Sequence, residues 1–339
     1  DDDYDEGAAA KKRKSRRNEI VPRFRPKSYA RVLDRGNITA FEKQLRMQAP
    51  SVLDGIRLGG PGRTPGRPKR LTVSRADGPV GLRIKRRTGI ANEEELAQLL
   101  PETDHQLRYK RCAIVGNSGI NLQHPRGHII DEYDAVMRLN NGPTSTYERF
   151  VGSKTTYRII NNAWSRFAAK SKGKSWSPHD TRERTHVLCF GNSSLKMFVK
   201  FRRQYPERST LYVSPEATKK ARSLYKKLHS RMEQAGFGPY EGGNVMPSGF
   251  EGMVFMMQLC DQLHVYGFDP QRDKAVKYHY FDEVQGVTKV HSFSLEFELL
   301  HLLHLTHHLK LCVHGYVSKY DCPDDLPKKN EFSELWADN

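Results

Sequence analysis

Two histidines near the end of the chain are the side chains best suited to acid–base chemistry. His279 and His291 flank a loop, and a histidine, with an ordinary pKa of about 6.5, is the usual base for a sugar hydroxyl. Glu296 follows His291 by five residues, close enough to orient the imidazole or to hold its proton. Because a single histidine is more often a core or surface side chain, these residues indicate catalysis only if a substrate site lies beside them.

Two glycine-containing segments could supply that site by holding a phosphate. Gly116-Asn-Ser-Gly119 follows an apolar run, and a turn at the end of a strand exposes backbone N–H groups. Ser248-Gly249 opens a second apolar run and offers the N–H groups of a helix start. Each segment is also explained by structure alone, as a tight turn or as a helix cap. Neither matches the dinucleotide-binding or P-loop pattern, so those two functions lose their main support.

Metal chemistry has little support in the sequence. His304 and His308 have the i, i+4 spacing of a metal site, but no third ligand accompanies them, and we expect a solvated stripe that also contains His301. No C-x-x-C pair occurs, which argues against zinc and thioredoxin chemistry. In a monomer at least one thiol stays unpaired, because the cysteines are Cys112, Cys189, Cys260, Cys312 and Cys322.

The elements that would position these groups alternate between strands and helices. Short apolar runs predict strands at 112–115, 134–139, 155–160, 186–190, 210–213 and 263–268. Helices are predicted at 194–203, 216–235, 249–261 and 294–309, the last opened by Ser294. This alternation predicts an α/β domain with a central, mostly parallel sheet and helices on both faces.

The first 100 residues differ in composition from the rest. They hold 23 Lys and Arg against 13 Asp and Glu, in a chain of net charge +17 that is only 37% hydrophobic. Residues 1–35 and 57–87 have the composition of disordered segments and linkers, and short helices are expected at 39–48 and 92–100. The predicted organisation is a basic, largely disordered stem or linker at 1–100, a folded domain at 101–325 and a C-terminal tail at 326–339.

The charge and the hydropathy of the chain also indicate whether to expect a nucleic-acid or a membrane partner. The basic block at 11–17 (KKRKSRR) resembles a phosphate-binding arm, yet it lacks interleaved aromatics, zinc spacing and a reading helix, so we expect no nucleic-acid partner. No run of about 20 apolar residues occurs, and the leading Asp is what we expect of a fragment cut after its targeting segment. Asn37 and Asn192 lie in glycosylation acceptor triplets, which fit a lumenal protein.

Taken together, four segments resemble the sialylmotifs of eukaryotic sialyltransferases. The large motif is similar to residues 112–157, which begin CAIVGNSG and contain MRLNNGPT, and the small motif to residues 246–268, which begin MPSGFEG. The third motif is similar to His279-Tyr-Phe-Asp282, and the very small motif to His291 with Glu296. All four agree with the family in order and spacing.

The resemblance implies a Rossmann-like, modified nucleotide-sugar glycosyltransferase fold that uses no metal and no other cofactor. It implies a disulfide between Cys112 and Cys260 and therefore an oxidising lumen. Cys312 and Cys322 could form a second bridge, which would leave Cys189 as a buried thiol. The expected location is the Golgi membrane, with a lumenal catalytic domain and a single-pass type II anchor that lies N-terminal to this fragment.

The resemblance further implies an inverting transfer of sialic acid from CMP-sialic acid to a hydroxyl of a glycan on a glycoprotein or glycolipid. His291 would take the proton of the attacking hydroxyl, His279 would hydrogen-bond the departing phosphate, and Glu296 would complete the catalytic set. The donor-binding residues implied for CMP are Asn117, Ser118, Asn140, Ser248 and Gly249.

Three departures from the motifs bear on the donor. Ile120 stands where Asn or Ser is usual, with Asn121 one position later. Phe281 stands where Tyr is common, and the small motif has one hydroxyl residue, Ser248, where two are usual. These departures resemble those of algal and plant sialyltransferase-like proteins. Two alternatives therefore stay open, a transferase that uses CMP-Kdo or a related keto-sugar acid and a catalytically weak nucleotide-binding scaffold.

Overall fold

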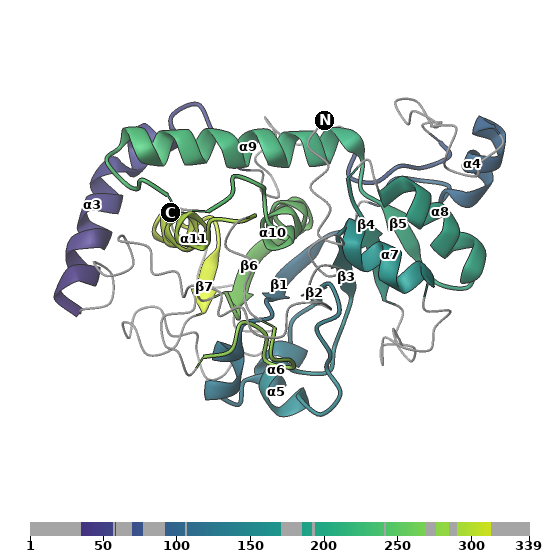
Figure 1. Ribbon diagram of the computed structural model, residues 1–339, viewed down its shortest axis with the longest axis horizontal. Helices are drawn as coiled ribbons and strands as arrows, with labels where there is room; N and C mark the ends of the chain where they lie inside the picture. The colour runs from purple at the N-terminus through teal and green to yellow at the C-terminus, as the bar shows by residue number, and fades with distance from the viewer. Residues whose placement is uncertain are drawn as a thin grey trace, which may run out of the picture.

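Parallel strands form the central sheet of the computed structural model (Figure 1). They lie in the order β5-β4-β3-β2-β1-β6-β7, and every neighbouring pair is parallel. The strands are β1 (Tyr109–Val115), β2 (Ala135–Leu139), β3 (Tyr157–Ile160), β4 (His186–Cys189), β5 (Thr210–Tyr212), β6 (Cys260–Tyr266) and β7 (Lys310–Cys312). The structure describes residues 35–56, 58, 70–76, 92–105, 107–170, 185–191, 194–240, 242–268, 276–284 and 290–312.

The strands are buried on both sides, which is why their sequences read as continuous apolar runs. Every residue of β2 and β3 is buried, as expected for parallel strands that helices cover on both faces. Ile159 packs into the core on one face, whereas its neighbour Ile160 packs into the core on the other. The six predicted strands are confirmed. The seventh, β7, was not predicted, because three residues that include Lys310 are too short a run to give a strand pattern.

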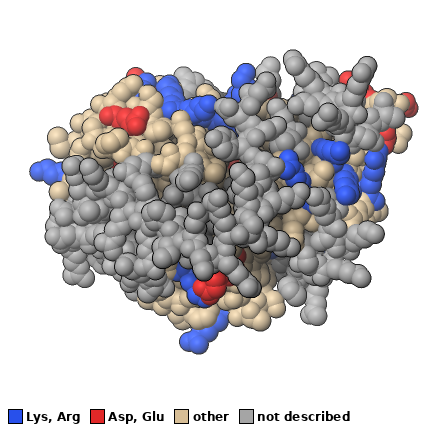
Figure 2. All heavy atoms as spheres, viewed as in Figure 1, with Lys and Arg blue, Asp and Glu red and all other residues tan. Residues whose placement is uncertain are grey.

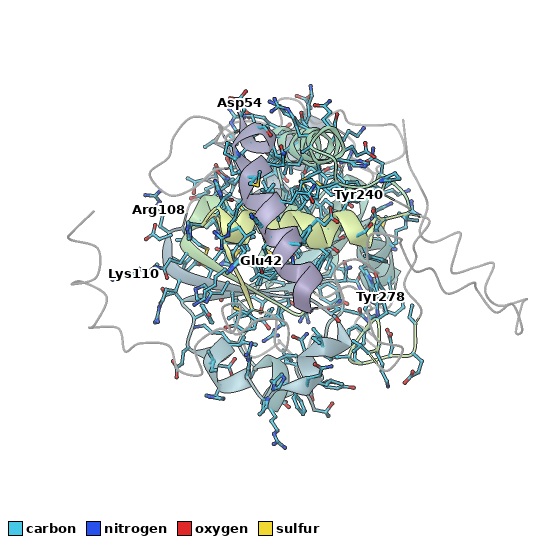
Figure 3. All side chains as sticks on the ribbon, turned by 90° about the vertical axis from the view of Figure 1, so that its left-hand side faces the viewer. Glu42, Asp54, Arg108, Lys110, Tyr240 and Tyr278 are labelled. Carbon is cyan, nitrogen blue, oxygen red and sulfur yellow. A yellow bond between two sulfur atoms is a disulfide. The ribbon has the colours of Figure 1, made fainter. Side chains whose placement is uncertain are left out.

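Three long helices cover one face of the sheet. α10 (Ser248–Leu259) packs on β1, β2, β3 and β6, and α9 (Pro215–Gln234) lies over α10. α11 (Phe293–Leu305) contacts β7. α3 (Arg35–Leu53) crosses outside them and contacts α9 and α11. Figure 3 looks onto α3, whose Glu42 is 2% exposed.

Shorter helices cover the opposite face, so the prediction of helices on both sides is confirmed. Below β1 and β2 lie η2 (Gly119–Gln123), α5 (Gly127–Asp131) and α6 (Glu148–Val151). α7 (Asn162–Lys170) and α8 (Leu195–Gln204) pack against β3, β4 and β5, and α4 (Glu93–Leu99) contacts α8. The short helices expected at 39–48 and 92–100 are α3 and α4.

The folded domain begins before residue 101, which corrects the predicted boundary. Leu45 of α3 is fully buried in the same core cluster as the sheet. Thr72 forms an antiparallel bridge with Val213 at the end of β5, and its N–H donates to Oδ1 of Asp104 at 2.8 Å. Both segments pack on the domain through side chains such as Leu45 and Leu71, which are buried in the same core cluster. Residues 1–34 and 326–339 lie outside the described part of the chain.

The disulfide implied by the motif resemblance joins Cys112 to Cys260, whose Cα atoms are 6.0 Å apart. It ties β1, the strand that leads to the Gly116 turn, to the junction of α10 and β6. Cys189 is a buried free thiol, as expected, and burial raises its pKa to about 12. Cys312 is disulfide-bonded, and its expected partner, Cys322, lies outside the described residues.

A buried hydrogen-bond chain lies under the carboxyl end of β6. The Tyr133 hydroxyl lies 2.9 Å from the Tyr266 hydroxyl and also bonds to Nδ1 of His264. Burial lowers the pKa of His264 to about 3, and the charges of Lys310 and Arg111 act in the same direction. The folded state therefore strongly favours the neutral ring.

Because the buried His264 ring is neutral, the free energy of unfolding depends on pH in the acidic range. An unfolded histidine titrates at about pH 6.5, so the folded state binds fewer protons than the unfolded state below that pH, and stability falls as the pH falls. Between pH 6.5 and pH 5 His264 should cost the wild type about 2 kcal/mol of unfolding free energy. The glutamine in His264→Gln does not titrate. Its free energy of unfolding in urea should therefore change less between pH 6.5 and pH 5 than that of the wild type. Equal slopes in both proteins would contradict this assignment.

Candidate active site

The predicted site residues converge on one edge of the sheet. In a parallel sheet all carboxyl ends lie at the same edge, where Gly116 follows β1 and Asn140 follows β2. Helices α10 and α11 lead into β6 and β7, so they run back across the sheet and their N-terminal ends return to that edge. Those ends carry Ser248 and Glu296. Open α/β sheets bind their ligands at this edge.

The turn after β1 is fixed by its contact with the end of β6. A Cβ atom at Gly116 would lie 2.3 Å from the Gly267 carbonyl oxygen, so a side chain has no room there. The Ser118 hydroxyl accepts the N–H of Ile120 at 3.3 Å and caps η2. The side-chain amide of Asn121 donates to the Gly116 carbonyl oxygen at 2.8 Å. In this structure both polar side chains therefore bond the turn itself.

Asn117 and Asn140 end neighbouring strands and come together at the site. Nδ2 of Asn117 donates to the carbonyl oxygen of Leu139 at 3.3 Å. Asn140 adopts a left-handed backbone conformation, with φ of +50°. Arg158, which is 3% exposed, holds this turn by donating from Nη1 to the carbonyl oxygens of Asn140 and Gly142, both at 3.0 Å. The buried guanidinium of Arg158 thus fixes the turn in which Asn140 lies.

Two substitutions at Asn140 separate its backbone role from its role toward the donor. Both lose the contact from the Asn161 N–H to Oδ1 of Asn140 at 3.1 Å, but glycine adopts the left-handed conformation freely, whereas alanine costs about 1 kcal/mol there. If the side chain contacts CMP, both variants should bind CMP about tenfold more weakly. Asn140→Ala should in addition be the less stable of the two. Calorimetric CMP titration measures this, and wild-type affinity in Asn140→Gly would limit Asn140 to a backbone role.

The start of α10 offers backbone donors beside a carboxyl group. The first N–H groups of an α-helix have no acceptor within the helix, and Ser248 is the first residue of α10. A Cβ atom at Gly249 would lie 2.4 Å from the Phe268 ring and 3.5 Å from Oε1 of Glu296. Burial raises the pKa of Glu296 to about 7, with the nearby His291 acting in the opposite direction. A carboxyl that is partly neutral near pH 7 repels a bound phosphate less.

A main-chain carbonyl holds His291. Nδ1 of His291 lies 2.8 Å from the carbonyl oxygen of Val245. Because a carbonyl oxygen can only accept, Nδ1 carries the proton and the basic lone pair of the neutral ring is on Nε2. Glu296 was expected to orient this imidazole. At Nδ1 that expectation is corrected, because Nδ1 bonds the carbonyl oxygen of Val245. Glu296 is close enough for the two groups to interact electrostatically.

His279 is paired with Asp282 in the same short segment. Nδ1 of His279 lies 3.0 Å from Oδ2 of Asp282, and its ring stacks on Phe281 with centroids 4.9 Å apart and planes 8° apart. The segment is anchored to the turn after β1, because the N–H of Tyr280 donates to the Asn117 carbonyl oxygen at 2.9 Å. With Nδ1 directed to a carboxylate, Nε2 is the nitrogen of His279 that could meet a donor phosphate.

Aromatic rings connect the two histidines. The ring of Tyr278 lies 4.4 Å from that of His279 and 5.6 Å from that of Phe293, measured between centroids. The Phe293 and His291 centroids are 6.4 Å apart. In Figure 3, Tyr278 and Tyr240 lie on the same side of the molecule. The structure thus brings His279 and His291 to the two sides of one Tyr278–Phe293 pair.

Three residues that support this edge were missed in the sequence. Arg158 lies within a strand, and its bonds to main-chain carbonyls become evident only when β2 and β3 are placed side by side. Val245 acts through its backbone and leaves no sequence signal. Asp282 does leave one, because a carboxylate three residues after His279 within one short motif could have been identified as its partner.

Two expectations about α11 are wrong. Its N-cap is Ser292, which accepts the N–H of Leu295, and not Ser294, which is buried within the helix. The histidine stripe is not solvated, since His301 is 3% exposed and His304 accepts a main-chain N–H at Nδ1. Both follow from the apolar sequence of α11, which is buried on nearly every side. Within the described ranges no group of three or more His, Cys, Asp or Glu side chains could hold a metal ion.

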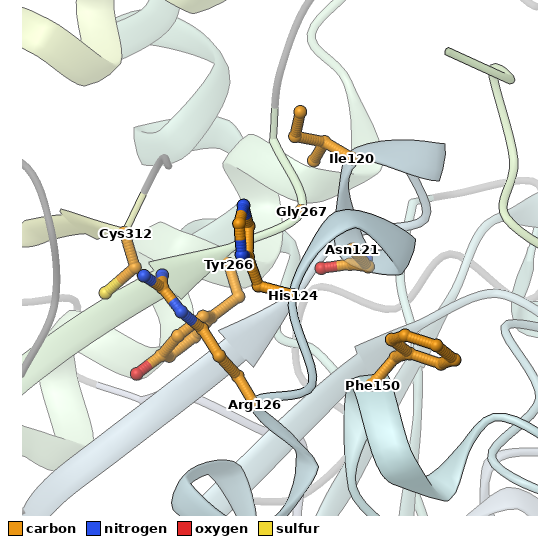
Figure 4. Close-up of a pocket in the computed structure, with 8 residues that line it drawn as sticks. All are labelled: Ile120, Asn121, His124, Arg126, Phe150, Tyr266, Gly267 and Cys312. Atoms are coloured by element: carbon orange, nitrogen blue, oxygen red, sulfur yellow. The ribbon is translucent and has the colours of Figure 1, made fainter. Parts of the chain in front are cut away.

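A small pocket lies beside the turn after β1, on the side of α5 (Figure 4). Ile120 and Asn121, the positions that depart from the large motif, both line it. The other lining residues are His124, Arg126, Phe150, Tyr266, Gly267 and Cys312. None of the predicted catalytic or CMP-binding residues lines this pocket. Ile120 and Asn121 therefore line a hollow beside the predicted CMP-binding residues.

Positive charge follows α9 on the outside of the domain. Figure 2 shows Lys and Arg side chains gathered along the upper edge, where α9 lies. A surface of one sign raises the local concentration of oppositely charged ligands, such as a nucleotide sugar. The exposed cations of this helix are Lys219, Lys220, Arg222, Lys226 and Lys227.

Comparison with known proteins agrees with the motifs. The profile of glycosyltransferase family 29 (sialyltransferase) matches residues 79–308. Beta-galactoside alpha-2,6-sialyltransferase 2 of Takifugu rubripes is 31% identical over 204 residues, which cover 55% of this chain and 35% of that protein. Sialyltransferase-like protein 2 of Arabidopsis thaliana is 29% identical over 202 residues, covering 58% of this chain and 39% of that protein. The chain therefore matches little more than a third of the length of these relatives.

A solved structure shares the fold. The crystal structure of a mammalian sialyltransferase in complex with Gal-beta-1-3GalNAc-ortho-nitrophenol matches with a TM-score of 0.50 and 18% identity, over 76% of this chain and 98% of that one. At this identity the similarity concerns the fold alone. The expected nucleotide-sugar glycosyltransferase fold is thereby confirmed.

Proposed function

The chain belongs to glycosyltransferase family 29, the sialyltransferases, and on that premise we propose that it transfers sialic acid from CMP-sialic acid to a hydroxyl of a glycan. The observation that carries the proposal is the meeting of Asn117, Asn140, the start of α10 and His291 at one sheet edge. Two asparagine turns and a helix start offer amide groups to a nucleotide and its phosphate. His291 adds a base with its lone pair on Nε2.

In the proposed reaction the acceptor oxygen attacks the anomeric carbon while the bond from that carbon to the CMP phosphate oxygen breaks. The electron pair of the broken bond leaves with CMP, and the proton of the acceptor hydroxyl moves to Nε2 of His291. His279, with its Nδ1 proton held by Asp282, donates from Nε2 of the doubly protonated ring to the departing phosphate, where negative charge grows. Attack from the side opposite CMP inverts the configuration at the anomeric carbon.

The proposed reaction uses the CMP ester as co-substrate and no metal or other cofactor. The departing CMP phosphate accepts hydrogen bonds from the backbone N–H groups at the start of α10 and from His279. Glu296, whose pKa burial raises to about 7, is partly neutral near pH 7 and so opposes the leaving group less than a fully ionised carboxylate would. These groups together perform the charge stabilisation that a metal ion supplies in other transferases.

The proposed setting is the Golgi lumen, with the domain held by an N-terminal single-pass type II anchor. The bridge between Cys112 and Cys260 supports this, because structural disulfides form in oxidising compartments. In the part of the chain that the structure describes, no helix combines the length and apolarity needed to span a bilayer. A galactose-terminated glycan is the acceptor to test first, since one relative is named a beta-galactoside sialyltransferase.

The donor is tested by incubating the protein with CMP-sialic acid or CMP-Kdo, with and without a galactose-terminated oligosaccharide. CMP release and the mass of the product are both measured. We expect acceptor-dependent release from CMP-sialic acid, at least about tenfold faster than from CMP-Kdo, a difference of about 1.4 kcal/mol in barrier. Faster transfer from CMP-Kdo would change the donor and keep the chemistry. Tight CMP binding without transfer from either donor would favour the nucleotide-binding scaffold.

A further inference from the structure

A histidine on α9, outside the motifs, connects to His291 through contacts in series. Nδ1 of His229 lies 3.0 Å from Oδ1 of Asn244. The next residue, Val245, donates its N–H to the Val290 carbonyl oxygen at 3.2 Å and accepts from Nδ1 of His291 at 2.8 Å. We propose that His229 is a positioning residue for His291: by holding Asn244 it fixes the carbonyl group that sets the tautomer and direction of the imidazole. This inference rests on the proposed role of His291 as the base.

Packing holds this loop only after Val245, where Met246 packs against the core cluster and Pro247 is buried. Residues 242–247 form neither helix nor strand, and Val245 is 39% exposed. On the Asn244 side, the position of Val245 depends on two hydrogen bonds. One is the pairing with Val290, and the other is the contact of Asn244 with His229.

His229 itself stands on a rigid base. α9 is 20 residues long, and it buries Tyr225, Leu228 and Met232 against the domain. The His229 ring packs edge-on against Tyr240 with centroids 5.3 Å apart, and Oε1 of Glu233 lies 3.4 Å from Nε2. Tyr240, at the other end of the loop, donates its hydroxyl to Oε2 of Glu298. The His229 side chain therefore ties the loop to a well-packed helix through its hydrogen bond with Asn244.

The contact with Asn244 survives a change in the charge of His229. An amide oxygen can only accept, so Nδ1 carries a proton in this contact, in the neutral ring and in the protonated ring alike. Glu233 lies near the other nitrogen, 3.4 Å away, without forming a hydrogen bond to it.

Loss of this anchor should disturb the chemical step more than donor binding. A displacement of about 1 Å in a catalytic group can cost about 100-fold in rate. Without the Val245 carbonyl, the proton of the neutral ring is no longer confined to Nδ1, and the imidazolium loses the acceptor that stabilises it. The expected result in His229→Ala is a kcat lowered by about 10- to 100-fold, a donor KM within about twofold of wild type, and an acidic limb of the pH–rate profile moved to lower pH.

The test compares His229→Ala with His229→Asn, in which the amide nitrogen occupies about the place of Nδ1 and still donates. Ser230→Ala, an exposed neighbour on α9, is the control for the helix. We expect His229→Asn to recover most of kcat and the wild-type pH profile, and Ser230→Ala to match the wild type. Wild-type kcat and pH profile in His229→Ala, in an enzyme that His291→Ala inactivates, would overturn the inference and leave the proposed function standing.

A second measurement decides the inference without relying on activity. Ring nitrogen NMR of the histidine-labelled protein, with the His291 signals assigned from His291→Ala, reports which nitrogen carries the proton. We expect a protonated Nδ1 in the wild type and in His229→Asn, and exchange between tautomers in His229→Ala. Identical His291 ring signals in the wild type and in His229→Ala would overturn the proposal even if no donor were turned over.

Discussion

Replacing His291 with alanine should lower kcat by about a thousandfold while leaving the fold and CMP binding close to wild type. General bases contribute about 10²- to 10⁴-fold to a rate. His291 supplies the base in the proposed mechanism, because its Nδ1 proton is held by Val245 and its lone pair is on Nε2. Since the base acts in the transition state, kcat and kcat/KM should fall together. Steady-state CMP release with saturating donor and acceptor measures both.

Two controls separate loss of the base from loss of structure. His128→Ala removes an exposed histidine on α5 and should retain wild-type activity. Free imidazole added to His291→Ala should restore part of the rate, because the substitution leaves space where the ring stood. Activity of His291→Ala within a few-fold of wild type would remove His291 from the mechanism, whatever imidazole does.

Removing the disulfide should strongly destabilise the folded domain. The cysteines are 148 residues apart, and for a closed loop of that length the chain-entropy relation gives about 5 kcal/mol. Both sulfur atoms belong to buried residues of the core. We therefore expect the double variant Cys112→Ala/Cys260→Ala to lose roughly 4 kcal/mol of unfolding free energy in denaturant titration.

The effect should also reach the nucleotide site. β1 leads to the Asn117 turn, and Cys260 directly follows α10, whose first residues are Ser248 and Gly249. Loosening this junction should weaken CMP binding together with stability. Cys189→Ala, at a buried thiol outside any bridge, is the matched control and should lose roughly 1 kcal/mol through a small cavity. A double variant no less stable than Cys189→Ala would show that the bridge contributes little to the folded state.

Much of the fold could be predicted from the sequence because buried parallel strands leave a strong local signal. The runs that became β1 to β6 were all identified, since apolar residues on both faces give continuous apolar sequence. The sheet edge that collects Asn117, Asn140 and Ser248 then follows from parallel topology alone. β7 and the burial of α3 were not predicted, because β7 is short and α3 lies in a strongly basic stretch. Their burial is decided by tertiary contacts.

The site was predicted in its residue types but not in its supports. His279 and His291 were found, yet the groups that hold them, Asp282 and the Val245 carbonyl, became visible only in three dimensions. Arg158 shows why, since a cation in the middle of a strand predicts exposure unless the main-chain carbonyls that accept from it are known. Glu296 was expected to orient His291 or to hold its proton, and it lies near enough to interact with the imidazole electrostatically. Nδ1, however, bonds a backbone carbonyl, which has no sequence signature.

The most direct test of the central claim is the stereochemistry of transfer from CMP-sialic acid to a galactose-terminated oligosaccharide, followed by NMR from the first turnovers. The proposed mechanism predicts one CMP released for each sugar transferred, and a new glycosidic bond whose anomeric configuration is opposite to that of the donor. The His291→Ala variant should give neither product at a measurable rate. A transferred sugar with the configuration of the donor, or CMP release that no acceptor accelerates, would contradict direct displacement by an acceptor activated by His291.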